Sequence, residues 1–236
     1  MLACGSAGCG RATLSWVSVS SDRLTMNVEC YGATRPQQGR SANEDAFLIT
    51  GGATPLVALC DGAGNAEMAA KKVLRLFRKL FEEAEPDDVA RFPTWASWVR
   101  VMDSSLLGGT QSTFVAGAVI GDRIVGACAG DSRAYLIDRD GNCNIMTEGS
   151  HGPASKFRLG SGRAEPSPIH LEMQPRDVLL LLSDGAWTPL SPELIRRAVV
   201  GAALKHFSEV PQAVLDAASR TGRADDMTAV ALRLRA

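Results

Sequence analysis

Three strand-like segments in the middle of the chain follow one another with almost no sequence between them. They span Ser112–Ile120, Arg123–Ala129 and Arg133–Asp138, and short turns rich in Gly and Asp connect them. Such short connections join antiparallel neighbours, because a parallel pair needs a crossover of about a dozen residues or more. We therefore expect mostly antiparallel sheet.

Strands occur in two groups, and helices follow each group. The remaining strand-like segments are Leu14–Val19, Thr25–Tyr31, Asp45–Thr50, Leu56–Cys60, Val178–Leu182 and Met227–Leu234. Apolar periodicity predicts helices at about Ala66–Ala84, Val89–Leu107, Pro192–Leu204 and Val210–Thr221. Residues 149–168 are rich in Gly, Pro and Ser, and we expect them to be irregular. This order indicates an α+β fold, best arranged as two stacked antiparallel β-sheets flanked by helices.

The composition fits one globular domain. The chain has 236 residues, 45% of them hydrophobic, and a net charge of -1. We expect a single domain over residues 1–236, with residues 1–12 loosely ordered. A net charge this close to zero gives no reason to expect nucleic acid as a partner. No apolar run reaches the length of a membrane span, and the cysteines form no C-x-x-C pair, so we expect a cytoplasmic protein with reduced thiols.

An aspartate and a glycine follow an apolar strand at two places in the chain, Asp61-Gly62 and Asp184-Gly185. A carboxylate at the end of a buried strand is costly unless it is paired or bound to a metal. The glycine permits a sharp turn and the close approach of a small ligand. Either pair alone is more often a simple turn.

Two further acidic groups stand where strands begin. Glu44-Asp45 opens one strand shortly after Arg40, and Asp225-Asp226 precedes the last strand. Carboxylates from four strand ends facing one cleft would repel each other in the absence of cations. Mg²⁺ and Mn²⁺ prefer oxygen ligands, and a pair of such ions suits phosphoryl hydrolysis. Each group alone is explained by strand-end polarity, whereas the ordered set together with an arginine favours a two-metal site.

Five motifs in this order resemble those of the type 2C metal-dependent protein phosphatases, the PPM family, and most of all its compact bacterial members. They are Arg40-x-x-Asn43-Glu44-Asp45, Asp61-Gly62-x-Gly64, Gly130-Asp131-Ser132-Arg133-Ala134, Ser183-Asp184-Gly185 and Asp225-Asp226-Met227-Thr228. The resemblance runs from about Met26 to Ala236. One such motif is weak, but five in order with suitable spacings are specific.

The resemblance implies a four-layer α-β-β-α sandwich, with helix pairs outside the two sheets, and a centre of two Mn²⁺ or Mg²⁺ ions. The implied ligands are the carboxylates of Asp45, Asp61, Asp184 and Asp225 and the backbone carbonyl of Gly62. Glu44 would orient these ligands, directly or through water. Arg40 would bind the substrate phosphate, which suits its planar fork. The implied reaction is direct attack of a metal-activated water on phosphoserine or phosphothreonine, without a cysteine nucleophile.

The implied partners are phosphorylated proteins, the targets of a cognate serine/threonine kinase in cytoplasmic signalling, with neither nucleic acid nor membrane involved. Two alternatives stay open. One is a catalytically silent relative that binds phosphoproteins. The other is a hydrolase of small phosphate esters, since two-metal chemistry does not by itself select proteins.

The chain departs from the family pattern at several positions. Ala63 stands where many eukaryotic members place a histidine proposed as general acid, so metal-bound water would protonate the leaving group. Gly108 occupies the position of an aspartate that binds a third metal, and Asp103 lies too early to replace it. The segment Glu148–Pro168 matches a substrate-facing flap but is short. Asp131 is interpreted as a residue that caps its turn and not as a ligand.

Overall fold

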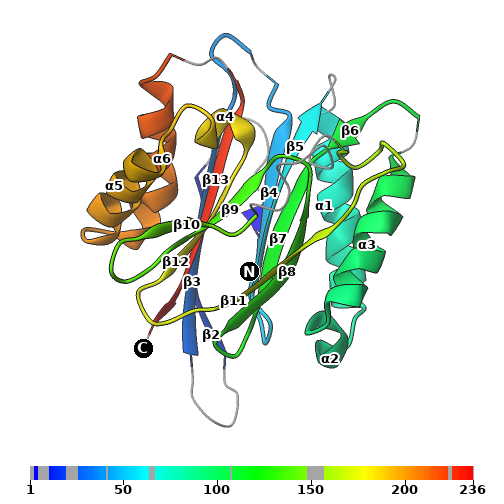
Figure 1. Cartoon of the computed structure of the whole chain (residues 1–236), viewed down its shortest axis with the longest axis horizontal. Coiled ribbons are helices and arrows are strands. Elements are labelled where there is room, and N and C mark those ends of the chain that lie inside the picture. Colours follow the sequence, from blue (N-terminus) through cyan, green and yellow to red (C-terminus); the bar gives the residue numbers. More distant parts are fainter. Residues whose placement is uncertain are drawn as a thin grey trace.

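Alternating apolar residues and tight turns produce strands that pair in two stacked sheets (Figure 1). The computed structural model describes residues 3–4, 11–19, 26–40, 42–63, 67–106, 108–147, 157–222 and 225–235. The first sheet contains β1 (Ala3–Cys4), β4 (Asp45–Thr50), β5 (Leu56–Ala63), β6 (Gln111–Ser112), β7 (Phe114–Ile120), β8 (Arg123–Ala129) and β11 (Ser167–Glu172). The second contains β2 (Arg11–Val19), β3 (Met26–Arg35), β9 (Arg133–Ile137), β10 (Cys143–Ile145), β12 (Val178–Leu182) and β13 (Met227–Arg235).

The strand order places distant parts of the chain side by side. The first sheet runs β1-β4-β5-β7-β8-β11, with β6 beside β5, and the second runs β10-β9-β12-β13-β3-β2. Every pairing among these strands is antiparallel. The last strand, β13, thus lies between β3 from the start of the chain and β12, and the predicted fold class is confirmed.

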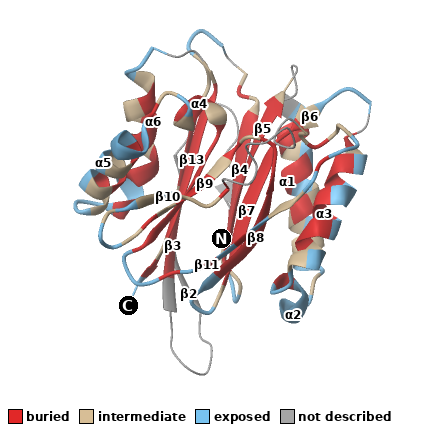
Figure 2. Ribbon diagram, in the orientation of Figure 1, coloured by how far each residue is buried: buried red, intermediate tan, exposed pale blue. Residues whose placement is uncertain are grey.

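Helices cover the outer face of each sheet. They are α1 (Glu67–Glu82), α2 (Pro86–Val89), α3 (Phe92–Ser105), α4 (Asp184–Trp187), α5 (Pro192–Ala203) and α6 (Val210–Ser219), with a short 3-10 turn, η3, at Phe207–Glu209. Helices α1 and α3 lie on one side of the sandwich and α5 and α6 on the other (Figure 1). The strands and the inner helix faces are buried, and the outer helix faces are exposed (Figure 2). Aromatic rings fill the α1–α3 layer, where the centroids of Phe77 and Phe114 lie 4.8 Å apart.

Strand alternation decides which side chains enter the space between the two sheets. In β4 and β5 these are Phe47, Ile49, Val57 and Leu59, whereas the residues between them pack beneath the helices. Because successive side chains of a strand point to opposite faces, Asp45 and Asp61 follow the same inward alternation. The local pattern therefore directs both carboxylates toward the interior between the sheets.

The helix predicted at about Val89–Leu107 is present as α3, but it begins later than expected, at Phe92. The short α2 ends at Val89, and the extended Arg91 (φ -112°, ψ 125°) is the N-cap of α3. Pro93 lies in the first turn of α3, where the N–H that proline lacks would have had no partner within the helix. Proline thus starts a helix here instead of interrupting one.

The segment expected to be irregular, residues 149–168, runs into β11, an edge strand that pairs with β8. Pro168 near its start is tolerated because an edge strand leaves one row of backbone groups unpaired. Of this segment and the predicted flap, residues 148–156 lie outside the described residues. Within residues 1–12, Ala3–Cys4 pairs with β4 and Arg11 and Ala12 pair with β3, and the others are not described.

Two absences hold for the part of the chain that the structure describes. None of its helices combines the length and apolarity needed to cross a membrane. Its cysteines with placed side chains are unbridged: Cys30, Cys60 and Cys128 are buried and Cys143 is half-buried.

The close contact between the sheets is testable at Gly32 of β3. A Cβ added there would lie 2.5 Å from Cε2 of Phe47, a ring that is 0% exposed. Since a buried ring in a close-packed core cannot swing away freely, we expect Gly32→Ala to lower the free energy of unfolding by about 1–3 kcal/mol in urea titrations. In the control Gly201→Ala in α5, the added Cβ meets nothing within 4 Å. That variant should gain about 0.5–1 kcal/mol from helix propensity, and equal effects of both changes would contradict the contact.

Candidate active site

Asp45 and Asp61 lie directly opposite each other on neighbouring strands of the first sheet. Residues paired in this way share one face, and their Cβ atoms are about 4.5–5.5 Å apart. Both residues are buried, at 4% and 9% exposure. Two acidic side chains therefore meet at the end of the sandwich interior.

Asp184 and Asp225 reach the same end from the second sheet. Asp184 begins α4 directly after β12, and Asp225 precedes β13, the strand that pairs with β12. Gly185 keeps the two segments in close contact, because an added Cβ would lie 2.0 Å from the backbone oxygen of Asp226 and 3.0 Å from Cβ of Asp225. The glycine of Asp184-Gly185 thus permits close approach of the backbone.

A buried chain of hydrogen bonds joins the two sheets at this end. The Ser183 hydroxyl donates to Oδ2 of Asp45 (2.7 Å) and accepts from the Thr228 backbone N–H (2.9 Å). The hydroxyls of Thr228 and Thr34 share a hydrogen bond of 2.7 Å, and Asn43 Nδ2 donates to Thr34 Oγ1 (2.7 Å). Asn43 Oδ1 accepts from the Asp45 N–H (3.0 Å), which closes the network. One oxygen of Asp45 is therefore held in place.

Burial and mutual repulsion change the pKa values of these carboxyl groups. Burial, and after it the neighbouring charges of Asp45 and Asp184, raise the pKa of Asp61 to about 10. Burial also raises the pKa of Asp45. Hydrogen bonds from Ser183 and Thr228 oppose this rise, the charges of Asp226 and Asp184 add to it, and the resulting pKa is about 7. Residues from both sheets thus form one acidic cluster, here defined as Asp45, Asp61, Asp184 and Asp225.

The acidic cluster has the chemistry of a site for hard cations. Oδ1 of Asp45 is buried and has no hydrogen-bond partner, and neither Asp45 nor Asp61 has an ion-pair partner among the described residues. All the available donors are oxygens, which Mg²⁺ and Mn²⁺ prefer. In the described part of the chain no three His, Cys, Asp or Glu groups are already arranged around one point. A bound cation would have to draw these carboxylates closer together.

The other predicted site residues lie beside the cluster. Arg40 is exposed, and its Nη1 is 3.6 Å from Oε2 of Glu44. The Gly62 N–H donates to the Glu44 carbonyl oxygen (3.1 Å), and Gly62 pairs with Ser112 of β6. The loop with the arginine and the strand end with the glycine are therefore attached to each other.

Asp226 has a role that sequence reasoning missed. Its carboxylate, 5% exposed, accepts hydrogen bonds of 2.6 Å from the backbone N–H groups of Gln37 and Glu44. It thereby anchors both ends of the loop that carries Arg40. The sequence signal for this role is the second acid of Asp225-Asp226.

Asp103 and Asp131 have hydrogen-bond partners that the sequence did not predict. Asp103 is buried and accepts backbone hydrogen bonds from residues 160, 162 and 164, at 2.7, 3.1 and 3.2 Å, so those bonds occupy its oxygens. The interpretation of Asp131 as a turn cap is wrong, since its carboxylate pairs with Arg158 across 27 residues of sequence. Neither partner of these acids could be read from local sequence.

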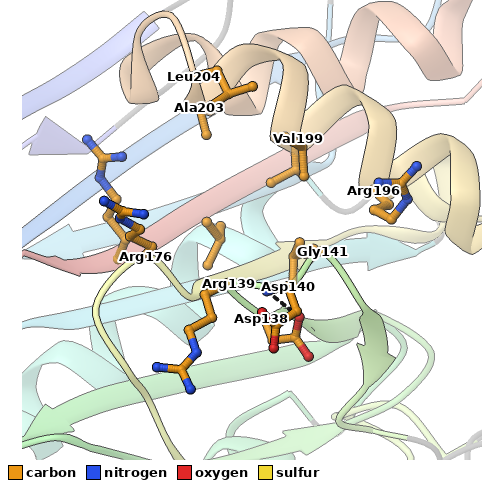
Figure 3. A pocket seen from close by; sticks show the side chains of 13 residues that line it. Asp138, Arg139, Asp140, Gly141, Arg176, Arg196, Val199, Ala203 and Leu204 are labelled. Atoms are coloured by element: carbon orange, nitrogen blue, oxygen red, sulfur yellow. Dashed lines mark hydrogen bonds between the residues drawn. The ribbon is translucent and has the colours of Figure 1, made fainter.

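A pocket of about 500 Å³ lies elsewhere, between the β9–β10 turn and the end of α5 (Figure 3). Arg139, Arg176 and Arg196 surround it together with Leu204 (Figure 3). Val178, at the start of β12, also lines it, whereas Asp184 follows the other end of that strand. The pocket is therefore separate from the acidic cluster.

Comparison with known proteins agrees with the geometry. The family profile described as Stage II sporulation protein E (SpoIIE) matches residues 52–235. The chain belongs to the SpoIIE family. This PP2C-like family assignment confirms the predicted relationship to the PPM phosphatases. No sequence among the curated proteins matches the chain.

Solved structures similar to the SpoIIE-family chain are serine/threonine phosphatases. The catalytic domain of PstP in complex with two manganese ions is 26% identical, with a TM-score of 0.74, and the match covers 90% of this chain and 100% of that one. The Mycobacterium tuberculosis phosphatase PstP/Ppp is also 26% identical (TM-score 0.72, 89% and 99% covered). Stp1 from Staphylococcus aureus, at 21% identity and a TM-score of 0.76, supports the fold alone (95% and 100% covered).

The raised pKa of Asp61 predicts a pH dependence of stability without metal. Because this pKa rises from its ordinary value near 4 to about 10 on folding, stability should fall as pH rises through this range. Asp61→Asn should flatten the dependence and raise the free energy of unfolding at pH 8 by about 1–3 kcal/mol, measured by thermal unfolding in EDTA. Asp140→Asn, at an exposed position, is the control. A less stable Asp61→Asn protein at pH 8 would contradict the electrostatic account.

Proposed function

We propose that this protein is a serine/threonine protein phosphatase that depends on Mn²⁺ or Mg²⁺. The observation that carries the proposal is the acidic cluster itself, in which carboxylates from opposite ends of the chain meet across two sheets. Such a concentration of buried negative charge is costly in a protein without cations. The PP2C-like family and the phosphatase structures of similar fold support the same activity.

In this proposal the metal ligands are the carboxylates of Asp45, Asp61, Asp184 and Asp225 and the backbone carbonyl of Gly62. When bound, two such cations supply positive charge to the phosphoryl group and lower the pKa of water, which becomes the nucleophile. Ser183 holds Oδ2 of Asp45 and leaves Oδ1 for a cation. Glu44 keeps the loop of Arg40 beside Gly62 through its backbone and orients ligands through its side chain.

Arg40 is the proposed contact to the substrate phosphate. Its side chain is 40% exposed, and its ion pair with Glu44 is long, at 3.6 Å, so the guanidinium can turn to an incoming anion at little cost. Asp226 preorganises the loop that presents it. Ala63 next to Gly62 has no proton to give, so protonation of the leaving oxygen falls to water.

The proposed substrates are phosphorylated proteins, with residues 1–236 acting as one phosphatase domain. A cognate serine/threonine kinase in a cytoplasmic signalling system would supply them. PstP, a serine/threonine protein phosphatase, supports this choice of substrate over a small ester.

The first test is Asp184→Asn, assayed with Mn²⁺ on a phosphothreonine peptide and on a chromogenic phosphate ester. Loss of a charged ligand should lower kcat/KM by about a hundredfold or more, since hydrogen bonds and charges at the reacting group act in the transition state. Far-UV circular dichroism should stay unchanged. Asp140→Asn is the control, because that carboxylate lies at the remote pocket.

The outcomes separate the alternatives. Full metal-dependent activity of Asp184→Asn would contradict the site. A wild-type protein that binds Mn²⁺ but hydrolyses neither compound would favour a silent phosphoprotein-binding relative. Hydrolysis of the ester without the peptide would favour a hydrolase of small phosphate esters.

The second test is Arg40→Ala. A charge-assisted hydrogen bond to phosphate contributes about 1.5–3 kcal/mol, so KM for the phosphopeptide should rise by about 10- to 100-fold. A smaller fall in kcat is expected if the contact tightens in the transition state. Arg40→Lys should recover part of the loss, because lysine keeps the charge without the planar fork. An unchanged KM of Arg40→Ala in steady-state kinetics would contradict the proposal that Arg40 binds the substrate phosphate.

A further inference from the structure

Arg158 precedes Leu159, which pairs with Ser112 beside the strand end of Asp61. Its Nη2 donates to both carboxylate oxygens of Asp131, at 3.1 and 2.9 Å. The side chain of Arg158 is 22% exposed and that of Asp131 33% exposed, so the pair lies at the rim and not in the core. An arginine carries five N–H donors, and this ion pair engages only the Nη2 group. No described residue is bonded to Nε or Nη1 of Arg158.

The backbone beside Arg158 is fixed. Leu159 is 0% exposed and exchanges two backbone hydrogen bonds with Ser112, of 2.8 and 3.1 Å. The Gly160 N–H donates to Asp103 (2.7 Å), and the positive φ of Gly160, 91°, suits a glycine. A Cβ at Gly160 would also lie 2.3 Å from a backbone oxygen. Arg158 therefore projects from an anchored segment.

The anchor of Arg158 is attached to the strand end that carries Asp61. The Ser112 hydroxyl donates to the Asp61 carbonyl oxygen (3.1 Å), and Thr113 exchanges hydrogen bonds with the Asp61 backbone through its own N–H (2.8 Å) and hydroxyl (2.9 Å). The partner of Arg158 is attached to the segment of Asp184, because the indole N–H of Trp187 in α4 donates to the Asp131 carbonyl oxygen (2.9 Å) and Asp184 begins the same helix. Arg158 and Asp131 are thus fixed to the two segments that carry Asp61 and Asp184.

We propose that Arg158 is a second phosphate-binding residue of the active site and that Asp131 positions it. This inference rests on the proposed phosphatase function. Asp131 holds Nη2, and Nε and Nη1 remain for the oxygens of a phosphate monoester or of released inorganic phosphate. Charge-assisted hydrogen bonds from a held arginine give both strength and direction. Two arginines on different loops, Arg40 and Arg158, then bind the substrate phosphate.

Two other roles for Arg158 make different predictions. A rim salt bridge with only a structural role contributes little, so its loss would leave kinetics nearly unchanged. A counter-ion that only offsets the negative ligands would compete with cations, so its loss would tighten Mn²⁺ binding without affecting phosphate. A phosphate-binding arginine alone predicts weaker binding of substrate and of inorganic phosphate.

The experiment compares Arg158→Ala, Arg158→Lys and Asp131→Asn with wild type. KM and kcat are measured on the phosphothreonine peptide, the inhibition constant is measured for inorganic phosphate, and Mn²⁺ affinity is measured by calorimetry. The control is Arg163→Ala, which removes the same charge from the same loop, where the guanidinium lies over Phe157 at 5.7 Å.

For Arg158→Ala we expect KM and the inhibition constant of phosphate to rise together by about 10- to 100-fold, with Mn²⁺ bound at least as tightly as in wild type. Arg158→Lys should recover part of this loss, Asp131→Asn should show a smaller rise, and Arg163→Ala should resemble wild type. Unchanged phosphate inhibition in Arg158→Ala, with or without tighter Mn²⁺ binding, would overturn the inference while the phosphatase function stands. A wild-type protein without activity on the peptide or the ester would overturn the proposed function and this inference with it.

Discussion

Negative charge concentrated between the two sheets is the constraint on which the rest of the site depends. Asp45 and Asp61 face each other on adjacent strands, and burial raises the pKa of both carboxyls. A buried carboxylate without a partner must take up a proton or meet a cation. Asp184 adds to the repulsion from the second sheet. The site is therefore poised to accept positive charge, and folding stability and metal binding are linked through the same residues.

Uncharged polar groups hold these carboxylates in place. Ser183, Thr228, Thr34 and Asn43 form a continuous hydrogen-bond network that ends on Asp45 and joins both sheets. A neutral network of this kind orients a carboxylate without neutralising it, which an arginine or lysine in the same place would do. Within the described part of the chain the network also leaves one oxygen of Asp45 without a partner, so the same scaffold positions the carboxylate and leaves it able to bind a cation.

The arginines near the cluster are paired, but with carboxylates outside it. Arg40 is paired loosely with Glu44, and Arg158 is held by Asp131. Each pair holds a guanidinium at the rim, where it can bind an incoming phosphate. The same pairing prevents the guanidinium from neutralising the acidic cluster in place of a metal cation. The division between acidic interior and basic rim is the electrostatic form expected of a site that binds metals and phosphate together.

The sequence by itself determined the sheets, most helices and the presence of acids at strand ends, because strand alternation, tight turns and Asp-Gly strand ends are local signals that one stretch of chain contains. Only the tertiary structure decided the partners of Asp226, Asp103 and Asp131, which lie up to 189 residues away in sequence. Local sequence holds no record of such contacts, because they exist only once β13 is placed between β3 and β12 and the loop at Arg158 is bridged to Ser112. For the same physical reason the sequence shows where an acidic residue stands, for example at a strand end. The groups that its carboxylate contacts depend on which segments pack against it in the folded protein.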